Sequence, residues 1–494
     1  MITTRFLDKS DLVSEEIIDS IYKILSIKKE MIKIELTTIM NVIRDDIVCF
    51  MEYPYVEKIY RDSYYSFFSK KHNPCHRDSL RISFFINDND RPINADNYFT
   101  IKNLDNYFLG YISLRPTTYR IIGSSFLHPL IMKNHDFVCC LCRKTVLVNG
   151  LKLTVYGFPY CAQDNESITC AEVSILNIME YFGHKYPEYS TILPSQIAKM
   201  LSKQIFERQL PSKGMMAHHI SYVLKKLGFG VIIHSCENEQ DDVVMYKNDD
   251  FIESLLIYIE SGIPVVLLSE DHAILAIGRK KIFDNHNKKN GVFKKEKNIR
   301  HLLVMNDNRP PYELMDYDVK KNSEFKIVSF IVPLYSKVNM NAYGLKASFN
   351  ATLKILQEEA KDVQFVRANK NYVYRYFFTS SKSYKDYIAK SQDLPYEFKV
   401  LALNKSMPKF IGVVEIINKT SFNMVDTVNK VDGIVVLDAT ESGVYNYLIF
   451  ATNLEYLIIR STQVSDYKIF KFNDKLMFHM FKNNLKGEHT QWKG

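Results

Sequence analysis

The chain of 494 residues is long enough for about two to four domains, and its 46% hydrophobic and 13% aromatic content argues against disorder over most of its length. No run approaches 18 uninterrupted apolar residues, so we expect no membrane-spanning helix. The chain does not open with a basic segment followed by an apolar one, as a secretory signal would, and eight cysteines are too few for a disulfide scaffold. We therefore expect a cytoplasmic protein. The formal net charge of +8 comes mostly from residues 279–300, which carry nine Lys or Arg against Asp284 and Glu296, so the remainder of the chain is nearly neutral.

Residues 1–150 mix helical and strand patterns. Residues 12–43 place apolar side chains at three- and four-residue spacing, which predicts a helical segment. Three runs rich in β-branched and aromatic residues predict strands, at Leu80–Ile86, Tyr107–Leu114 and Phe137–Val148. We therefore expect an N-terminal α+β region with a regulatory role.

Residues 151–335 place several helices before several short strands. Three helices are predicted over 170–182, 215–227 and 249–261, followed by Gly183, Gly228 and Gly262. A glycine directly after the last apolar position is a common helix stop. The predicted strands are Val265–Ser269, His272–Gly278, His301–Asn306 and Phe325–Pro333.

The basic segment 279–300 lies between two of these strands. We expect a solvated, lysine-rich loop, and contact with an acidic partner is the alternative. The sequence has no glycine-rich phosphate loop and no helix or zinc module typical of DNA recognition, so specific nucleic-acid binding is not predicted. The oligomeric state stays open.

Residues 336–494 form a second α+β region, for which we expect substrate or partner binding. A helix is predicted near Ala347–Ala360. The predicted strands are Phe398–Leu403, Phe410–Ile417, Gly433–Leu437 and Tyr447–Ala451.

The strongest chemical signal is Cys170. Thr169 and Glu172 have the spacing of a helix capping box, and apolar side chains then recur at helical spacing. Cys170 is therefore predicted in the first turn of a buried helix, where free amide N–H groups and the helix dipole favour a thiolate of lowered pKa. The alternative is an ordinary buried thiol.

Three more residues complete a possible acyl-transfer site around Cys170. Gln163 precedes the helix, and its side-chain amide can donate to an oxyanion together with the backbone N–H of Cys170. His272 stands between two apolar strands and is the candidate base. Asp307 follows the next strand and is the preferred partner of the imidazole, although Asn306 and Asn308 would also serve.

This order of Gln163, Cys170, His272 and Asp307 resembles that of papain-like cysteine peptidases. Within them, residues 155–335 look most similar to the bacteriocin-processing, double-glycine-cleaving peptidase family, in the Cys170 helix and in SGIPVVLLSEDHAILAIG at 261–278. The resemblance implies an α+β fold with a papain-like core at 151–335, flanked by the N- and C-terminal α+β regions.

The resemblance also implies a function. We expect a bacterial intracellular processing, regulatory or defence peptidase that hydrolyses a peptide or isopeptide bond of a protein or peptide substrate without a cofactor. Ala171 and Glu172 stand where the family usually has Gly-Pro. Two alternatives are an acyltransferase of transglutaminase type, with the same catalytic residues, and an inactive papain-like scaffold that serves as a binding module.

Two further clusters could supply zinc ligands. One is His72, Cys75 and His76, and the other is Cys139, Cys140 and Cys142. Neither has the paired spacing of common structural zinc sites, so we expect no metal.

Overall fold

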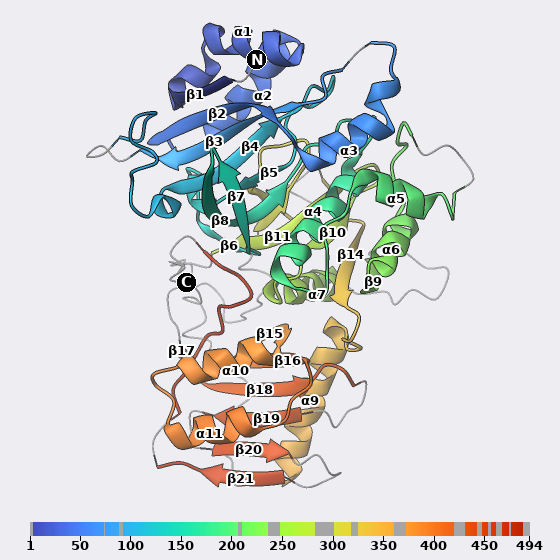
Figure 1. Cartoon of the computed structure of the whole chain (residues 1–494). Coiled ribbons are helices and arrows are strands. Elements are labelled where there is room, and N and C mark those ends of the chain that lie inside the picture. The colour runs from blue at the N-terminus through green and yellow to red at the C-terminus, as the bar shows by residue number, and fades with distance from the viewer. Residues whose placement is uncertain are drawn as a thin grey trace, which may run out of the picture.

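The computed structural model describes residues 3–73, 75–87, 92–205, 210–235, 248–281, 301–317, 325–359, 372–418, 430–441, 447–452, 456–460, 467–473 and 476–487. Three large sheets follow one another along the molecule (Figure 1). Every strand pairing between the described strands is antiparallel. The described residues contain no helix long and apolar enough to cross a membrane.

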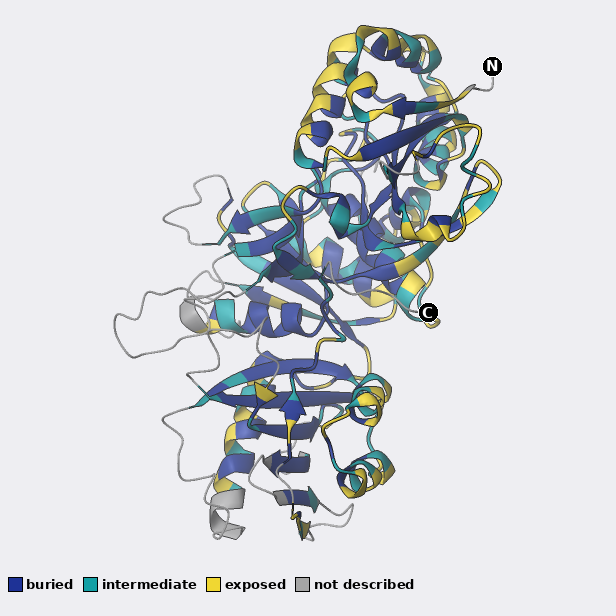
Figure 2. Ribbon diagram, turned by 90° about the vertical axis from the view of Figure 1, so that its left-hand side faces the viewer, coloured by how far each residue is buried: buried dark blue, intermediate teal, exposed yellow. Residues whose placement is uncertain are grey.

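The N-terminal sheet has seven strands. In spatial order these are β1 (Thr3–Asp8), β2 (Ile47–Tyr55), β3 (Ser79–Ile86), β4 (Phe108–Leu114), β5 (Ser125–Leu127), β8 (Leu151–Tyr160) and β7 (Cys142–Val148). The division predicted near residue 150 falls in the turn between β7 and β8, so this sheet continues to Tyr160. Its central strands are buried, while the helices beside it expose one face (Figure 2).

The helical segment predicted over 12–43 is two helices, α1 (Glu15–Leu25) and α2 (Lys29–Val42). They are separated at Ser26, which adopts a left-handed conformation with φ 56°. Ser14 caps α1 by accepting from the Ile17 backbone N–H. A third helix, α3 (Lys58–Ser66), follows β2.

The middle sheet carries the segment with the chemical signals. Its spatial order is β13 (Glu313–Asp316), β12 (His301–Met305), β11 (Ala273–Lys280), β10 (Val265–Leu268), β14 (Ser329–Tyr335) and β9 (Phe229–Ser235). The single strand predicted at 137–148 is two strands, β6 (Phe137–Cys139) and β7. β7 pairs in the N-terminal sheet, whereas β6 pairs with β11 of the middle sheet. The N-terminal and middle regions are therefore joined by a shared strand pairing.

The described helices of the middle region are α4 (Cys170–Lys185), α5 (Pro194–Leu201), α6 (Ala217–Lys226) and α7 (Asn248–Glu260). The predicted stops at Gly228 and Gly262 are confirmed, because both have positive φ, +95° and +68°. The stop at Gly183 is wrong, because α4 continues two residues further. A Cβ at Gly183 would lie 3.0 Å from the Thr191 backbone nitrogen, so this glycine permits a close approach of the chain.

The C-terminal sheet is a meander of β15 (Tyr372–Ser380), β16 (Phe410–Asn418), β18 (Gly433–Asp438), β19 (Tyr447–Thr452), β20 (Tyr456–Arg460) and β21 (Tyr467–Lys471). Helix α9 (Ala342–Glu359) lies on one face, and α10 (Ser381–Lys390) and α11 (Tyr396–Asn404) lie on the other (Figures 1 and 2). The small strands β17 (Lys430–Val431) and β22 (Phe478–His479) pair with each other. The strand predicted at Phe398–Leu403 is wrong, because these residues belong to α11.

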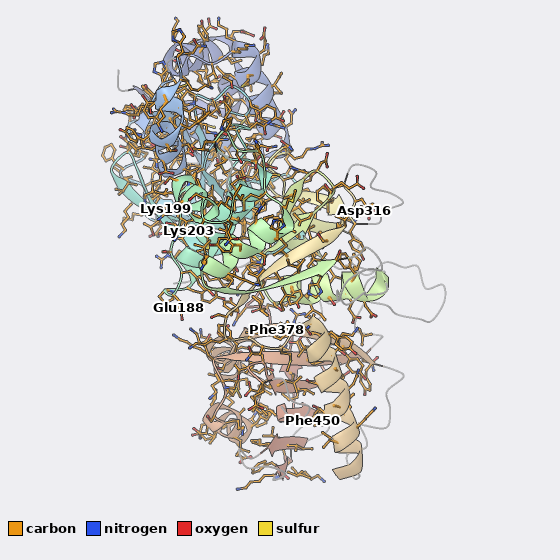
Figure 3. All side chains as sticks on the ribbon, turned by 90° about the vertical axis from the view of Figure 1, so that its right-hand side faces the viewer. Glu188, Lys199, Lys203, Asp316, Phe378 and Phe450 are labelled. Carbon is orange, nitrogen blue, oxygen red and sulfur yellow. The ribbon has the colours of Figure 1, made fainter. Side chains whose placement is uncertain are left out.

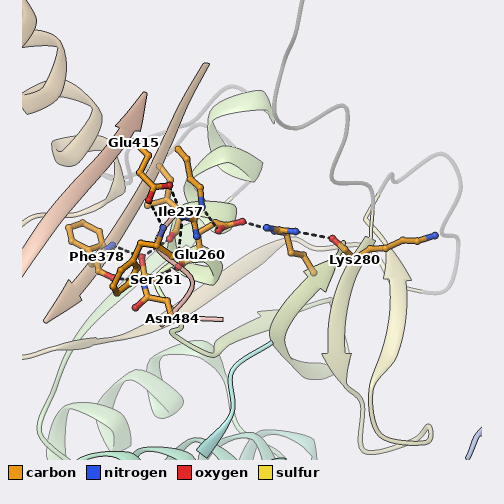
Figure 4. Close-up of polar contacts among 10 residues, drawn as sticks. Ile257, Glu260, Ser261, Lys280, Phe378, Glu415 and Asn484 are labelled. Atoms are coloured by element: carbon orange, nitrogen blue, oxygen red, sulfur yellow. Dashed lines mark hydrogen bonds and ion pairs between the residues drawn. The ribbon is translucent and has the colours of Figure 1, made fainter. Parts of the chain in front are cut away.

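A buried ionic network joins the middle and C-terminal regions (Figure 4). Glu260 at the end of α7 binds Arg279 of β11 at 2.5 Å and Arg375 of β15 at 2.8 Å. Arg375 also binds Glu415 of β16 at 2.7 Å. Arg279 is thus a buried structural residue, contrary to its expected place in a solvated basic loop. Residues 282–300 of that loop lie outside the described residues.

Candidate active site

A tight turn before α4 presents Cys170 to its surroundings. The side-chain oxygen Oδ1 of Asp164 accepts from the backbone N–H groups of Glu166, Ser167 and Ile168 at 2.9, 2.6 and 3.0 Å. These three short-range hydrogen bonds hold the chain in place just before the helix begins. Cys170 is the first residue of α4, as the capping pattern predicts.

The capping residue Glu172 also ties the helix to a neighbouring loop. Its Oε2 accepts from the Thr169 backbone N–H at 3.2 Å, which is one of the two hydrogen bonds of the predicted capping box, and both are present. Its Oε1 accepts from the Ser212 hydroxyl at 2.6 Å. Glu172 therefore fixes the loop before α6 beside Cys170.

His272 lies in the turn between β10 and β11. The Ser269 backbone N–H donates to the His272 carbonyl at 2.9 Å, and the His272 backbone N–H donates to the Ser269 hydroxyl at 3.1 Å. The histidine therefore precedes β11 by one residue, whereas the sequence predicts that it begins the strand. Its position at the end of a hairpin places the imidazole at the edge of the middle sheet.

The imidazole nitrogen Nε2 of His272 faces the three residues that follow β12. It lies 3.2 Å from Asn306 Oδ1, 3.3 Å from Asp307 Oδ1 and 3.4 Å from Asn308 Nδ2. The Asp307 contact has the distance of an ion pair, but neither carboxylate oxygen has a well-aligned hydrogen bond among the described residues. All three predicted partners thus surround one nitrogen, and no described residue hydrogen-bonds to Nδ1.

Cys170 and His272 line the same cavity, which has a volume of about 600 Å³. Strand β11 begins at Ala273, whose backbone N–H lowers the pKa of the thiol. Within the described part of the chain, no hydrogen bond joins the Cys170 thiol to the imidazole. The two side chains share an open space but are not in direct hydrogen-bonded contact.

Burial raises the pKa of the Cys170 thiol to about 11. The backbone N–H groups of Ala273 and Ala171 lower this pKa, and the negative charge of Asp307 raises it further. The expected lowering of the pKa at the helix N-terminus is therefore wrong, because desolvation of the thiolate outweighs the amide donors. At neutral pH the group is a thiol, and nucleophilic attack would require a base to accept its proton.

Asp307 is only 3% exposed. Burial raises the pKa of its carboxyl group to about 6, while His272, Arg120 and Arg115 lower it. Above pH 6 the carboxylate is negatively charged and lies 3.3 Å from His272 Nε2, where a general base would need a counter-charge after it takes a proton.

Gln163 is buried and reaches the same group of residues. Its Nε2 donates to Asn308 Oδ1 at 2.9 Å. Gln163 does not line the cavity beside Cys170. It lies against the turn that follows β12, and not beside the thiol where the sequence predicts an oxyanion donor. The described donors next to the thiol are the backbone N–H groups of Ala171 and Ala273.

Sequence patterns missed the walls of this cavity. Apolar side chains come from Ile205, Met215, Met216 and Leu268, and carboxylates come from Glu172, Glu270 and Asp271. Glu270 and Asp271 directly precede His272 and could have been noticed from that adjacency alone. The residues before α6 had no comparable signal, because tertiary contacts such as the Ser212–Glu172 hydrogen bond hold them near Cys170.

The two clusters that could have supplied zinc ligands have other surroundings in the described structure. His76 Nε2 lies 3.0 Å from the Ser26 hydroxyl, and the thiols of Cys139, Cys140 and Cys142 are buried. Among the described residues, no group of three or more His, Cys, Asp or Glu side chains has an arrangement suited to a metal ion.

Comparisons of this chain with protein-family models, with curated proteins and with solved structures found no match.

Proposed function

We propose that this chain is a papain-like cysteine peptidase that hydrolyses a peptide or isopeptide bond of a protein or peptide. The observation that supports this most is the common cavity, which exposes Cys170 at a helix N-terminus and His272 with Nε2 against Asp307. No described residue hydrogen-bonds to Nδ1 of the imidazole, so in this proposal Nδ1 accepts the thiol proton and the Asp307 carboxylate stabilises the imidazolium. A nucleophile, a base and an orienting acid are the groups that covalent acyl transfer requires.

In the proposed reaction His272 takes the thiol proton as the Cys170 sulfur attacks the substrate carbonyl. In this proposal the backbone N–H groups of Ala171 and Ala273, both of which lower the pKa of the thiol, donate to the developing oxyanion. The imidazolium then protonates the leaving amine, and water hydrolyses the thioester. A reducing compartment such as the cytoplasm suits this chemistry, and all described cysteines are free.

Thiol alkylation tests the proposal before any substrate is known. We expect iodoacetamide to modify Cys170 faster than Cys75 at pH 7.5, because His272 assists removal of the thiol proton. Cys75 is the matched control, since it is also partly exposed and burial also raises its pKa. The H272A substitution should slow alkylation of Cys170 by about 100-fold and leave that of Cys75 unchanged. Peptide mapping by mass spectrometry gives both rates in one sample.

An inactive binding scaffold is the second candidate. The raised thiol pKa and the absence of a thiol–imidazole hydrogen bond among the described residues favour it. It predicts equal alkylation rates for Cys170 in the wild type and in H272A. Cleavage of a denatured protein mixture by the wild type, but not by C170A, would exclude the inactive scaffold. Products that contain an added amine would indicate acyl transfer instead of hydrolysis.

A further inference from the structure

The N-terminal region reaches the turn that carries Asp307. Arg120 lies in the loop between β4 and β5, and its Nη2 donates to the backbone carbonyl of Asn308. Its Nη1 binds Glu35 of α2 at 2.9 Å. Glu35 is 7% exposed, so the pair is anchored inside the protein.

Asn308 is bound at all four of its polar groups. Its backbone N–H donates to Asn306 Oδ1 at 3.0 Å. Its carbonyl accepts from Arg120, its Oδ1 accepts from Gln163 at 2.9 Å, and its Nδ2 lies 3.4 Å from His272 Nε2. The next carbonyl, that of Arg309, accepts from the Tyr160 hydroxyl at the end of β8 at 2.6 Å. Two backbone carbonyls of this turn are thus held by side chains from the N-terminal sheet and its loops.

The same region supplies positive charge near Asp307. Arg115 is 1% exposed and donates to the carbonyl of Ala162. Arg115, Arg120 and His272 all favour the ionised carboxylate against the effect of burial. Among the described groups, Tyr160, Cys161 and Cys170 also sense its charge, which raises the pKa of each.

We propose that Arg120, held by Glu35, is a positioning residue for the catalytic histidine, and that the N-terminal region thereby completes the active site. This inference rests on the proposed peptidase function. Arg120 acts through Asn308 and Asp307, because it fixes the turn on which both face His272 Nε2. Loss of its two hydrogen bonds would allow the turn to move, and a shift of about 1 Å at a catalytic group can cost about 100-fold in rate.

The test measures alkylation of Cys170 by iodoacetamide between pH 5 and 9 in the full-length chain. We expect R120A and E35Q to slow alkylation at pH 7 by about ten- to 100-fold. R120A should also move the acid limb of the profile up by about one pH unit, since removal of a cation raises the pKa of Asp307. E35Q has nearly the same shape as the wild-type side chain and serves if R120A does not fold.

Two further variants separate positioning from general stability. R120K keeps the positive charge, so it should restore the position of the acid limb while recovering only part of the rate. R5A removes the exposed Arg5–Glu16 pair of the same region and should leave rate and profile unchanged. A rate that depends on His272 but is the same in R120A, E35Q and R5A would overturn this inference alone. A wild-type rate that does not depend on His272 would instead overturn the proposed function.

Discussion

Asp307 combines near-complete burial with a partner at the edge of the cavity. Its folded pKa of about 6 lies above the ordinary value of 3.8, because desolvation penalises the carboxylate more than its cations stabilise it. The stability conferred by the protonated carboxyl group is therefore fully present below pH 3.8 and is lost as the pH rises through 6. Near neutral pH the charged side chain costs stability, which is common for residues kept for chemistry.

The substitution D307N should raise stability and lower activity at the same time. An amide carries no charge to desolvate, so the free energy of unfolding at pH 8 should increase by about 2–3 kcal/mol, with a smaller gain at pH 5. Urea unfolding at both pH values measures the difference. Alkylation of Cys170 should slow because the imidazolium loses its counter-charge. A destabilised D307N at pH 8 would show that Asp307 has a stronger partner than His272.

The thiol of Cys170 allows a direct check of its surroundings. In H272A, alkylation of Cys170 should increase with pH and reach half its maximum rate near pH 11, the value set by burial. The wild type should react substantially at a lower pH, since the imidazole assists proton removal. Rate profiles from stopped alkylation reactions compare the two, and identical profiles would mean that His272 does not act on the thiol.

At the scale of single elements, β11 links the candidate site to the N-terminal region through Gly278. A Cβ at this position would lie 2.2 Å from the Val138 carbonyl oxygen of β6, so the β6–β11 pairing has no room for a side chain. Gly230 on β9 has ordinary spacing, with its nearest neighbours at 3.4 Å. The same substitution should therefore have different consequences on two strands of one sheet.

We expect G278A to lower the free energy of unfolding by about 2–3 kcal/mol, because a backbone carbonyl must move. G230A should change it by less than about 1 kcal/mol. Thermal unfolding followed by circular dichroism gives both values. Equal effects of the two substitutions would contradict the close approach of β6.

The elements also show where periodicity is informative. The helix over Cys170 follows from a capping pattern and a long apolar pattern, and the helices before Gly228 and Gly262 also have correct local stop signals. The run Phe398–Leu403 is short and apolar, and such a run has no period that separates a strand from a helix. Its residues Phe398 and Ala402 are buried four positions apart, which is the helical spacing that α11 uses.

At the scale of the whole molecule, two of the described ionic contacts between the middle and C-terminal regions differ strongly in exposure. Glu260 in the buried network is 0% exposed, whereas Glu188 pairs with Lys409 at the surface and is 49% exposed. Figure 3 shows Glu188 and Phe378 on the two sides of this junction. Removal of one partner from a buried network leaves uncompensated charges, whereas solvent screens the loss of a surface pair.

Replacement of Glu260 should therefore lower the free energy of unfolding much more than replacement of Glu188. E260A should lower the free energy of unfolding by about 3–5 kcal/mol, because Arg279 and Arg375 lose a shared partner. E188A should lower it by less than about 1 kcal/mol. Chemical unfolding with probes in both regions measures the loss, and similar values would mean that the junction does not depend on the buried network.

The sequence by itself determined the features that depend on nearby residues: the helix that begins at Cys170, the glycine stops of two later helices, and strands that end close to His272 and Asp307. Only the tertiary structure decided which distant groups meet. Arg120 and Glu35 lie at the turn that carries Asp307, β6 pairs with the middle sheet, and Arg279 belongs to the buried ionic network. The tertiary structure also reversed the expected pKa shift of Cys170. Local pattern reports backbone preference, whereas burial and charge pairing depend on contacts between residues far apart in the chain.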